Sequence, residues 1–236
     1  MTVRIKLWDL PTRVFHWTLV GLVAVSFATG FTGGNAMEWH GRAGILIIGL
    51  LTFRIAWGFV GSSHARFGSF VRGPAAVIGY LRGRWSGIGH NPLGALSVLA
   101  MLALLLCQAL GGLVANDDIA FNGPYFNAIA KDLSDRVTGW HKRGGWVILG
   151  LISLHLGAIL YYTHVRKETL IKPMLSGTKE VPDSLAGESA RGGSLTALVV
   201  AVVLGVAAGW AASGVLQPAP QSSNQTAPPA KPSPAW

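Results

Sequence analysis

"GWHKRGGWVILGLISLHLGAILYY", residues 139–162, decides the fold of this chain, because it is long and apolar enough to form a helix that crosses a membrane. Two histidines, His141 and His155, interrupt it fourteen positions apart. Fourteen helical residues rise roughly 21 Å and stop about 40° short of four full turns. The two imidazoles therefore lie on nearly the same face of one helix, at two depths in the membrane.

The composition of the whole chain indicates a membrane protein. Half of the residues are hydrophobic and only 12% are charged, whereas about 25% of the residues in a soluble domain are charged. The net charge of +9 would suggest nucleic-acid binding in a soluble protein. Here the basic residues lie between apolar segments, as they do in loops on the cytoplasmic side of a bilayer. We therefore expect contact with membrane lipid and none with nucleic acid. The single cysteine, Cys107, lies in an apolar run, and the chain has no Cys-x-x-Cys-His motif for covalent haem attachment.

Five segments are long enough to span the hydrocarbon core of a bilayer. They are residues 13–31, 41–60, 92–115, 140–163 and 194–216. The first follows basic residues, as a signal peptide does, but it lacks a convincing small-residue cleavage site, so we expect it to be retained. Basic residues are concentrated before the first span, between the second and third, and after the fourth. The N-terminus is therefore predicted to be cytoplasmic and the C-terminus periplasmic.

The segments outside the spans differ in composition. Residues 67–85 mix aromatic residues with arginines, which predicts a short amphipathic helix along the inner membrane surface. Asn91 followed by Pro92 is typical of a helix start. We expect residues 179–193 to form a cytoplasmic linker and residues 217–236 to form a disordered Pro-rich tail.

The alternating direction of the spans pairs four histidines by depth. His16 is near the start of the first span, which begins inside, so it is level with His155. His40 is at the start of the second span, which begins outside, so it is level with His141. Two helices that offer imidazoles from opposite sides can hold a planar macrocycle, and haem iron accepts two such axial ligands. The first pair is the predicted inner haem site, and the second pair is the predicted outer one.

Packing, zinc binding and proton transfer are the alternatives to haem ligation for these four histidines. A single histidine in a membrane helix is commonly a hydrogen-bonded packing residue. Structural zinc usually takes four close ligands, often with sulfur among them. A proton relay usually includes Asp or Glu, and the five spans contain neither except at their margins. Four histidines at two matched depths therefore favour haem ligation.

Arg54 is predicted to bind a propionate of the inner haem. It follows His40 by fourteen residues, the same spacing that separates His141 from His155. A guanidinium inside a bilayer is costly and usually has an anionic partner. A haem propionate at this depth would supply that anion, and the guanidinium fork suits a carboxylate. The alternative is that Arg54 extends towards the membrane surface without a specific partner.

Three further histidines lie at inner loops or helix ends. His64, His90 and His164 are expected to be solvated or interfacial polar residues. As an alternative, His64 in GSSHARF or His90 in GHNPLG lines a quinone pocket near the inner haem.

At these motifs the sequence resembles the prokaryotic cytochrome b561 family, which is similar to the b-type cytochrome subunits of nickel–iron hydrogenases. The resemblance covers about residues 5–178. It rests on WDLPTRVFHW, WHGRAGILIIGLLTFRIAWGFVGSSHARF, GHNPLGAL, WHKRGGWVILGLISLHLGAILYY and IKPMLSGTK. It implies an all-α, integral membrane four-helix bundle that holds two b haems in residues 1–178, in the bacterial inner membrane. It also implies the same ligand assignments: His40 and His141 for the outer haem, His16 and His155 for the inner one. Arg54 matches the family's arginine in the second helix.

The resemblance implies electron transfer between the quinone pool and a redox partner such as a periplasmic c-type cytochrome. A second hypothesis is a membrane anchor of a hydrogenase-like or other oxidoreductase complex, so that the chain is either an electron carrier or an enzyme subunit. A haem-free transporter or assembly scaffold is a third. The fifth span, 194–216, lies beyond the family core. Gly205 and Gly209 give it a close-packing face, which either binds a larger membrane complex or is an inert small-residue surface.

Overall fold

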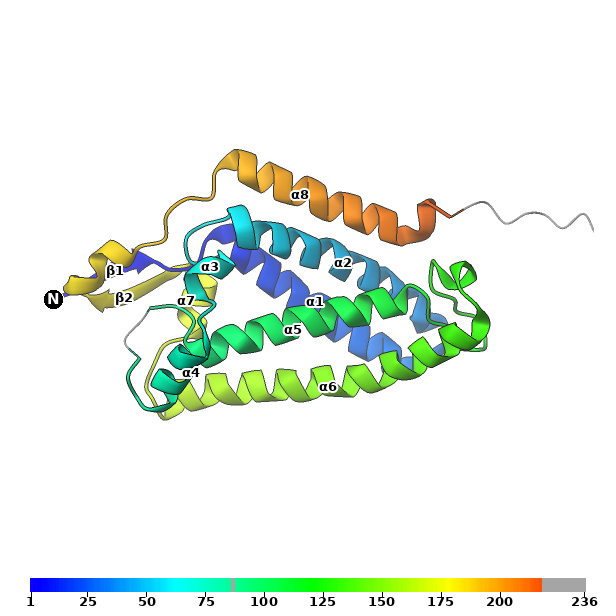
Figure 1. Ribbon diagram of the computed structural model, residues 1–236, viewed down its shortest axis with the longest axis horizontal. Helices are drawn as coiled ribbons and strands as arrows, with labels where there is room; N and C mark the ends of the chain where they lie inside the picture. The colour runs from blue at the N-terminus through cyan, green and yellow to red at the C-terminus, as the bar shows by residue number, and fades with distance from the viewer. Residues whose placement is uncertain (86–87, 218–236) are drawn as a thin grey trace, which may run out of the picture.

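The computed structural model describes residues 1–85 and 88–217, and most of them are helical (Figure 1). Five long helices run side by side in alternating directions. They are α1 (Leu10–Thr32), α2 (Met37–Val60), α5 (Pro92–Gly112), α6 (Lys131–His164) and α8 (Leu195–Trp210). Each is long and apolar enough to cross a membrane, α8 together with the turn that follows it. This confirms the predicted all-α membrane bundle with a fifth span.

The outer faces of the helices carry many exposed large apolar side chains, as a lipid solvent requires. Examples are Leu154, Leu156 and Leu160 on α6, and Val199, Val203 and Val206 on α8. Inside the bundle, a cluster of Phe15, Ile47 and Leu51 joins α1 to α2 and contacts α5. α1 packs against α2, and α5 packs against α6 and α2. In the described residues, however, the backbone of α6 makes almost no contact with those of α1 and α2.

A polar side chain caps the start of three of the spans, namely Asp9 at α1, Asn91 at α5 and Ser194 at α8. Asp9 precedes α1, and its Oδ1 accepts a hydrogen bond of 2.7 Å from the backbone N–H of Thr12. Asn91 precedes α5, and its Oδ1 accepts one of 2.7 Å from the N–H of Gly94. A side-chain acceptor at this position satisfies an N–H that has no partner within the helix. The structure therefore confirms the predicted helix start at Asn91 and Pro92.

A two-stranded sheet lies at one end of the bundle, where the sequence predicted none. β1 (Thr2–Lys6) pairs antiparallel with β2 (Thr178–Pro182), with Val3 opposite Val181. Ile5 and Val181 are buried. The short helix α7 (Ile171–Ser176) leads into β2. We call this the sheet end, and we call the opposite end, which carries residues 113–130 and the short helix η2 (Phe126–Ala128), the loop end.

The predicted linker is also structured. After β2, the turn η3 (Asp183–Glu188) and residues 189–193 run along the sheet end to α8. We call residues 183–193 the connector. The backbone of Lys6 in β1 makes two hydrogen bonds to it: its O accepts from Ala190 N at 2.7 Å, and its N–H donates to the side-chain Oγ of Ser189 at 3.2 Å. The connector is therefore part of the folded sheet end.

The surface helix predicted over residues 67–85 is two helices, α3 (Phe67–Phe70) and α4 (Pro74–Leu81). The prediction of one helix was wrong because Pro74 has no N–H to donate and clashes with the preceding turn inside a helix. Pro74 instead occupies the first position of α4, where both properties are harmless. Phe70 is buried.

α6 begins at Lys131, well before the predicted start of its span near residue 140. Its first turns pack on the loop end through polar groups. The side-chain amide of Asn116 donates to Ser134 Oγ at 2.7 Å, and its backbone N–H donates to Thr138 Oγ1 at 3.1 Å. All three residues are buried. This extension is polar, so hydropathy alone did not reveal it.

α8 packs along α2 of its own bundle, with Ala201 fully buried between them. The turn η4 (Ala211–Val215) ends it at the loop end, where Tyr125 donates a hydrogen bond of 2.6 Å from its hydroxyl to the O of Ala211. The close-packing face of the fifth span at Gly205 therefore contacts α2 of the same chain. The predicted Pro-rich tail lies outside the described residues, apart from Gln217.

Candidate functional site

The structure brings His40 and His141 together in the half of the bundle nearer the loop end. Their ring centroids are 5.8 Å apart and the ring planes are 80° apart. His40 is on α2 and His141 is on α6, two helices whose backbones hardly touch in the described residues. The two imidazoles therefore face each other across a space between helices.

Backbone carbonyls hold both rings of this pair. His40 Nδ1 lies 2.8 Å from the O of Ser26, and His141 Nδ1 lies 3.0 Å from the O of Gln108. A carbonyl oxygen can only accept a hydrogen bond, so Nδ1 carries the hydrogen in both rings. Each Nε2 then keeps its lone pair, which is the form that ligates a metal.

Glycines make room for the two rings. A Cβ on Gly30 would lie 3.1 Å from His40 Nδ1, and a Cβ on Gly112 would lie 3.3 Å from His141 Cε1. Gln108 is fixed in turn, because its side-chain amide donates to the O of His141 at 2.8 Å. The sequence did not reveal these supporting residues, because a glycine or glutamine in a membrane helix has no distinctive spacing.

His16 and His155 lie in the half of the bundle nearer the sheet end, on α1 and α6. Both are partly buried. The ring of His16 meets the edge of Trp17 at a centroid distance of 5.0 Å. Its Nδ1 is buried and has no hydrogen-bond partner among the described residues. Each histidine is therefore on the sheet-end half of its helix, and His16 has a buried nitrogen without a partner among the described residues.

Arg54 is buried near the same end of α2, with only 3% of its surface exposed. Its guanidinium lies 5.0 Å above the ring of Phe67, and its Nη1 has no hydrogen-bond partner among the described residues. The charge of Asp9 attracts it. Asp9 accepts hydrogen bonds from the N–H of Thr12 and from Trp57 Nε1 at 3.0 Å, and none of the salt bridges within 4 Å among the described residues joins it to Arg54.

A buried guanidinium nitrogen without an acceptor is strongly unfavourable unless an anion satisfies it. The burial of Arg54 also disfavours the alternative in which its head group reaches the membrane surface. A carboxylate of a haem propionate fits the unsatisfied nitrogen and its fork geometry.

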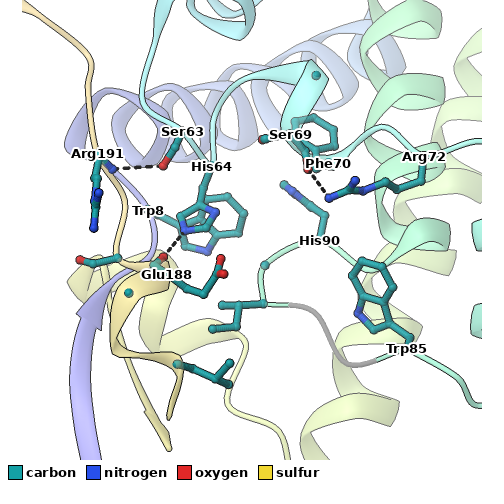
Figure 2. Close-up of a pocket in the computed structure, with 16 residues that line it drawn as sticks. Trp8, Ser63, His64, Ser69, Phe70, Arg72, Trp85, His90, Glu188 and Arg191 are labelled. Atoms are coloured by element: carbon teal, nitrogen blue, oxygen red, sulfur yellow. Dashed lines mark hydrogen bonds between the residues drawn. The ribbon is translucent and has the colours of Figure 1, made fainter. Parts of the chain in front are cut away.

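A cleft of about 570 Å³ opens at the sheet end, and both His64 and His90 line it (Figure 2). His90 lies between two aromatic rings, those of Trp8 and Phe70, each with a centroid 4.8 Å from its own. Its Nδ1 is buried and has no partner among the described residues. Burial and the nearby Arg54, His64 and His155 lower the pKa of His90 to about 4, so the ring is neutral.

Next to His90 in the sequence, Asn91 forms a cluster with Tyr80 and Tyr162, and the sequence did not reveal these contacts. The hydroxyls of Tyr80 and Tyr162 contact each other. The amide of Asn91 donates to Tyr80 at 3.3 Å and to Tyr162 at 3.2 Å. His164, one of the predicted interfacial residues, is exposed at the end of α6.

The described residues contain no group of three or more His, Cys, Asp or Glu side chains that could hold a metal ion. Each histidine pair offers two imidazoles, and haem iron takes two axial ligands from the two faces of its macrocycle. The donor chemistry of both pairs and of Arg54 fits haem.

Comparison with known proteins places these residues in a family core. The family model described as prokaryotic cytochrome b561 matches residues 7–177. Both histidine pairs, Arg54 and the two cleft histidines lie inside this match, whereas β2, the connector and α8 lie beyond it. No solved structure gives a significant match.

The curated relatives are of one kind. A probable Ni/Fe-hydrogenase B-type cytochrome subunit of Rhizobium leguminosarum bv. viciae is 23% identical, over 76% of this chain and 90% of that protein. The corresponding subunit of Azotobacter vinelandii is 26% identical over the same shares. The probable Ni/Fe-hydrogenase 1 B-type cytochrome subunit of Escherichia coli K12 is 22% identical, over 72% of this chain and 88% of that protein.

Proposed function

The chain belongs to the prokaryotic cytochrome b561 family, and we propose that it carries two b haems that pass electrons between a membrane quinone and a redox partner. The family and the five apolar helices make it a multi-pass bacterial membrane protein and a b-type cytochrome of electron transfer. The number of haems, the quinone and the partner are the proposal.

The observation that carries the proposal is the facing pair His40 and His141. Their rings are 5.8 Å apart across helices that barely touch, and both Nδ1 atoms are bound to carbonyls. Both Nε2 atoms are therefore prepared as ligands to one iron. When bound, a haem held by two imidazoles supplies a one-electron carrier without an open coordination position.

The second haem is proposed between His16 and His155. The support is the unsatisfied Nδ1 of His16 and the unsatisfied, buried Nη1 of Arg54 at the same end of the bundle. In this proposal Arg54 binds a propionate and raises the electrostatic potential at this iron. The residues of α6 hold the two irons at two depths, because His141 and His155 share one face of the helix.

We place the quinone at the sheet end, in the cleft lined by His64 and His90. A quinone head group is planar and has two polar oxygens. The rings of Trp8 and Phe70 offer apolar surfaces for its plane, and the two histidines offer polar atoms for its oxygens.

The distribution of charge supports a cytoplasmic sheet end. Basic residues gather there, namely Arg66, Arg72, Arg82, Arg84, Arg166, Lys167 and Lys172. Acidic residues gather at the loop end, namely Asp117, Asp118, Asp132 and Asp135. The proposed orientation has the N-terminus in the cytoplasm, the end of α8 in the periplasm, and the redox partner at the loop end.

A second candidate function is the membrane subunit of a hydrogenase-like complex, which the names of the curated relatives favour. The two candidates share the haems and the quinone and differ only in the partner. Co-purification from the native membrane, followed by identification of the bound proteins, distinguishes them.

The decisive experiment is a reduced-minus-oxidised absorption spectrum of the purified chain, with the haem counted per chain as its pyridine complex. Two low-spin b haems, extractable with acidic acetone, are expected. A count of one haem would remove one of the two pairs from the proposal. A chain without haem would contradict the proposal as a whole.

A further inference from the structure

One wall of the cleft is built from the connector, which lies outside the family match that ends at residue 177. The connector residues in this wall are Leu185, Gly187, Glu188, Ser189 and Arg191. The facing wall, with His64 and His90, belongs to the family core. The cleft is therefore a composite of a family part and a part that the family match does not include (Figure 2).

Backbone contacts fix the connector against the loop that follows α2. The N–H of Ser63 donates to the O of Arg191 at 2.8 Å, and the N–H of Arg191 donates to Ser63 Oγ at 3.1 Å. Ser62 pairs with Gly192 as an isolated antiparallel bridge. The wall is therefore held at one position relative to the family core.

Two glycines allow this close approach. Gly192 and Gly193 both have φ of +80°, a conformation that strains any residue with a Cβ. A Cβ on Gly193 would also lie 3.1 Å from the ring of Trp57. Trp57 is buried one helical turn after Arg54, so the connector packs directly on the part of α2 that carries the buried arginine.

The connector also sets the hydrogen-bonding state of His64. The Nε2 of His64 lies 2.7 Å from the O of Glu188. Because a carbonyl oxygen can only accept, Nε2 carries the hydrogen and Nδ1 keeps a lone pair in the neutral ring. Among the described residues, Nδ1 of His64 has no hydrogen-bond partner. His64 therefore offers an acceptor in the wall of the cleft.

We infer that the connector completes the quinone cleft and makes His64 a positioning residue for the reduced, quinol form. This inference rests on the proposed quinone site. A quinol carries hydroxyl groups, which donate a hydrogen bond to the Nδ1 lone pair. An oxidised quinone carries only carbonyl oxygens, which cannot. The cleft therefore binds quinol more tightly than quinone, and the connector is responsible for the difference.

The test uses the purified full-length chain with both haems, reduced by a short-chain ubiquinol while the haem absorbance is followed. His64→Leu removes the acceptor and should raise KM for the quinol roughly ten-fold. His64→Gln should stay within about two- to three-fold of the unchanged chain, because its amide can donate to the O of Glu188 and its carbonyl can accept. Affinity for the oxidised short-chain quinone should change less than KM for quinol in the leucine variant.

The role of the connector is tested separately. Ser63→Ala removes the acceptor for the N–H of Arg191 and should raise KM roughly three-fold, with the maximal rate little changed. The matched control is Ser184→Ala, which alters an exposed serine of the same connector away from the cleft. It should leave KM unchanged. Dithionite-reduced spectra should show the same haem content in all four variants.

The outcomes separate this inference from the function on which it rests. If quinol reduces the unchanged chain but the leucine and alanine variants keep its KM, the inference is wrong and the quinone site stands. If quinol does not reduce the unchanged chain at all, the quinone site itself is contradicted. If Ser63→Ala loses haem, its KM cannot be used. The positioning role is then judged from His64→Leu against His64→Gln, because neither substitution alters the contacts of Ser63. Equal loss of affinity in those two variants would overturn the positioning role.

Discussion

Gly49 of α2 and Gly205 of α8 meet backbone to backbone. A Cβ on Gly49 would lie 2.9 Å from the O of Gly205, and a Cβ on Gly205 would lie 2.8 Å from the O of Gly49. The small-residue face of α8 is thus occupied within the chain. A partner in the membrane would have to bind α8 through its exposed valine and leucine side chains instead.

The first prediction concerns this contact. Gly205→Leu should separate α8 from α2 and destabilise the protein by about 1–3 kcal/mol, the usual cost of overpacking a close contact. The measurement is the thermal unfolding of the purified chain in detergent. The control is Val206→Leu, because Val206 is 67% exposed on the same helix. Equal effects of the two variants would argue against the backbone contact.

Removing α8 is the second prediction. A chain that ends after Ser194 keeps the connector and all five proposed haem-binding residues, but it uncovers the face of α2 that packs on α8. Both haems should still bind. The thermal unfolding temperature of the shortened chain should be lower than that of the full chain. If the shortened chain binds no haem, α8 is required for the bundle to fold. If its unfolding temperature is unchanged, the packing of α8 contributes nothing measurable.

Single substitutions of the histidines test the pairing. His40→Ala and His141→Ala should remove one and the same haem, and His16→Ala and His155→Ala should remove the other. The reason is that the members of a pair ligate one iron from opposite faces. Low-temperature spectra or redox titration distinguish the two haems. Loss of the same haem from His40→Ala and His155→Ala, with that haem retained in His141→Ala, would contradict the pairing.

Arg54 should set the midpoint potential of the haem nearer the sheet end. Arg54→Leu removes a positive charge, which favours the oxidised iron, so that potential should fall by roughly tens of millivolts. Arg54→Lys keeps the charge and should shift it less. The other haem should change little, because fourteen helical residues separate the two levels by roughly 21 Å. Redox titration of both variants gives the comparison, and equal shifts in the two haems would argue against a local propionate contact.

Hydropathy and the alternating direction of the helices were sufficient to predict the five spans and the closeness of His40 to His141. Those features depend on residue types and on the spacing between residues, and both can be read directly from the sequence. The predicted helix start at Asn91 was also confirmed, because capping is a local interaction between neighbours. The pairing of His16 with His155 stays a prediction.

The sheet and the connector depend on contacts that counting cannot supply. β1 and β2 pair with each other although nearly the whole family core separates them in the sequence. Each strand is too short for its alternation of buried and exposed side chains to be recognised. The wall of the cleft is made largely by backbone groups, such as the O of Glu188 and the N–H of Arg191, which are the same in every residue. The polar start of α6 was missed because its burial depends on Asn116 from a separate loop.

The pairing of β1 with β2 has a consequence for biosynthesis. The ribosome synthesises β1, residues 2–6, near the start of translation. Its partner β2, residues 178–182, is synthesised much later. Four membrane helices are translated in between. The amino-terminal strand must therefore wait without its partner while those helices insert, and the connector that completes the cleft follows immediately after β2. The cleft can therefore be completed only late in synthesis, after the four paired histidines have all been translated.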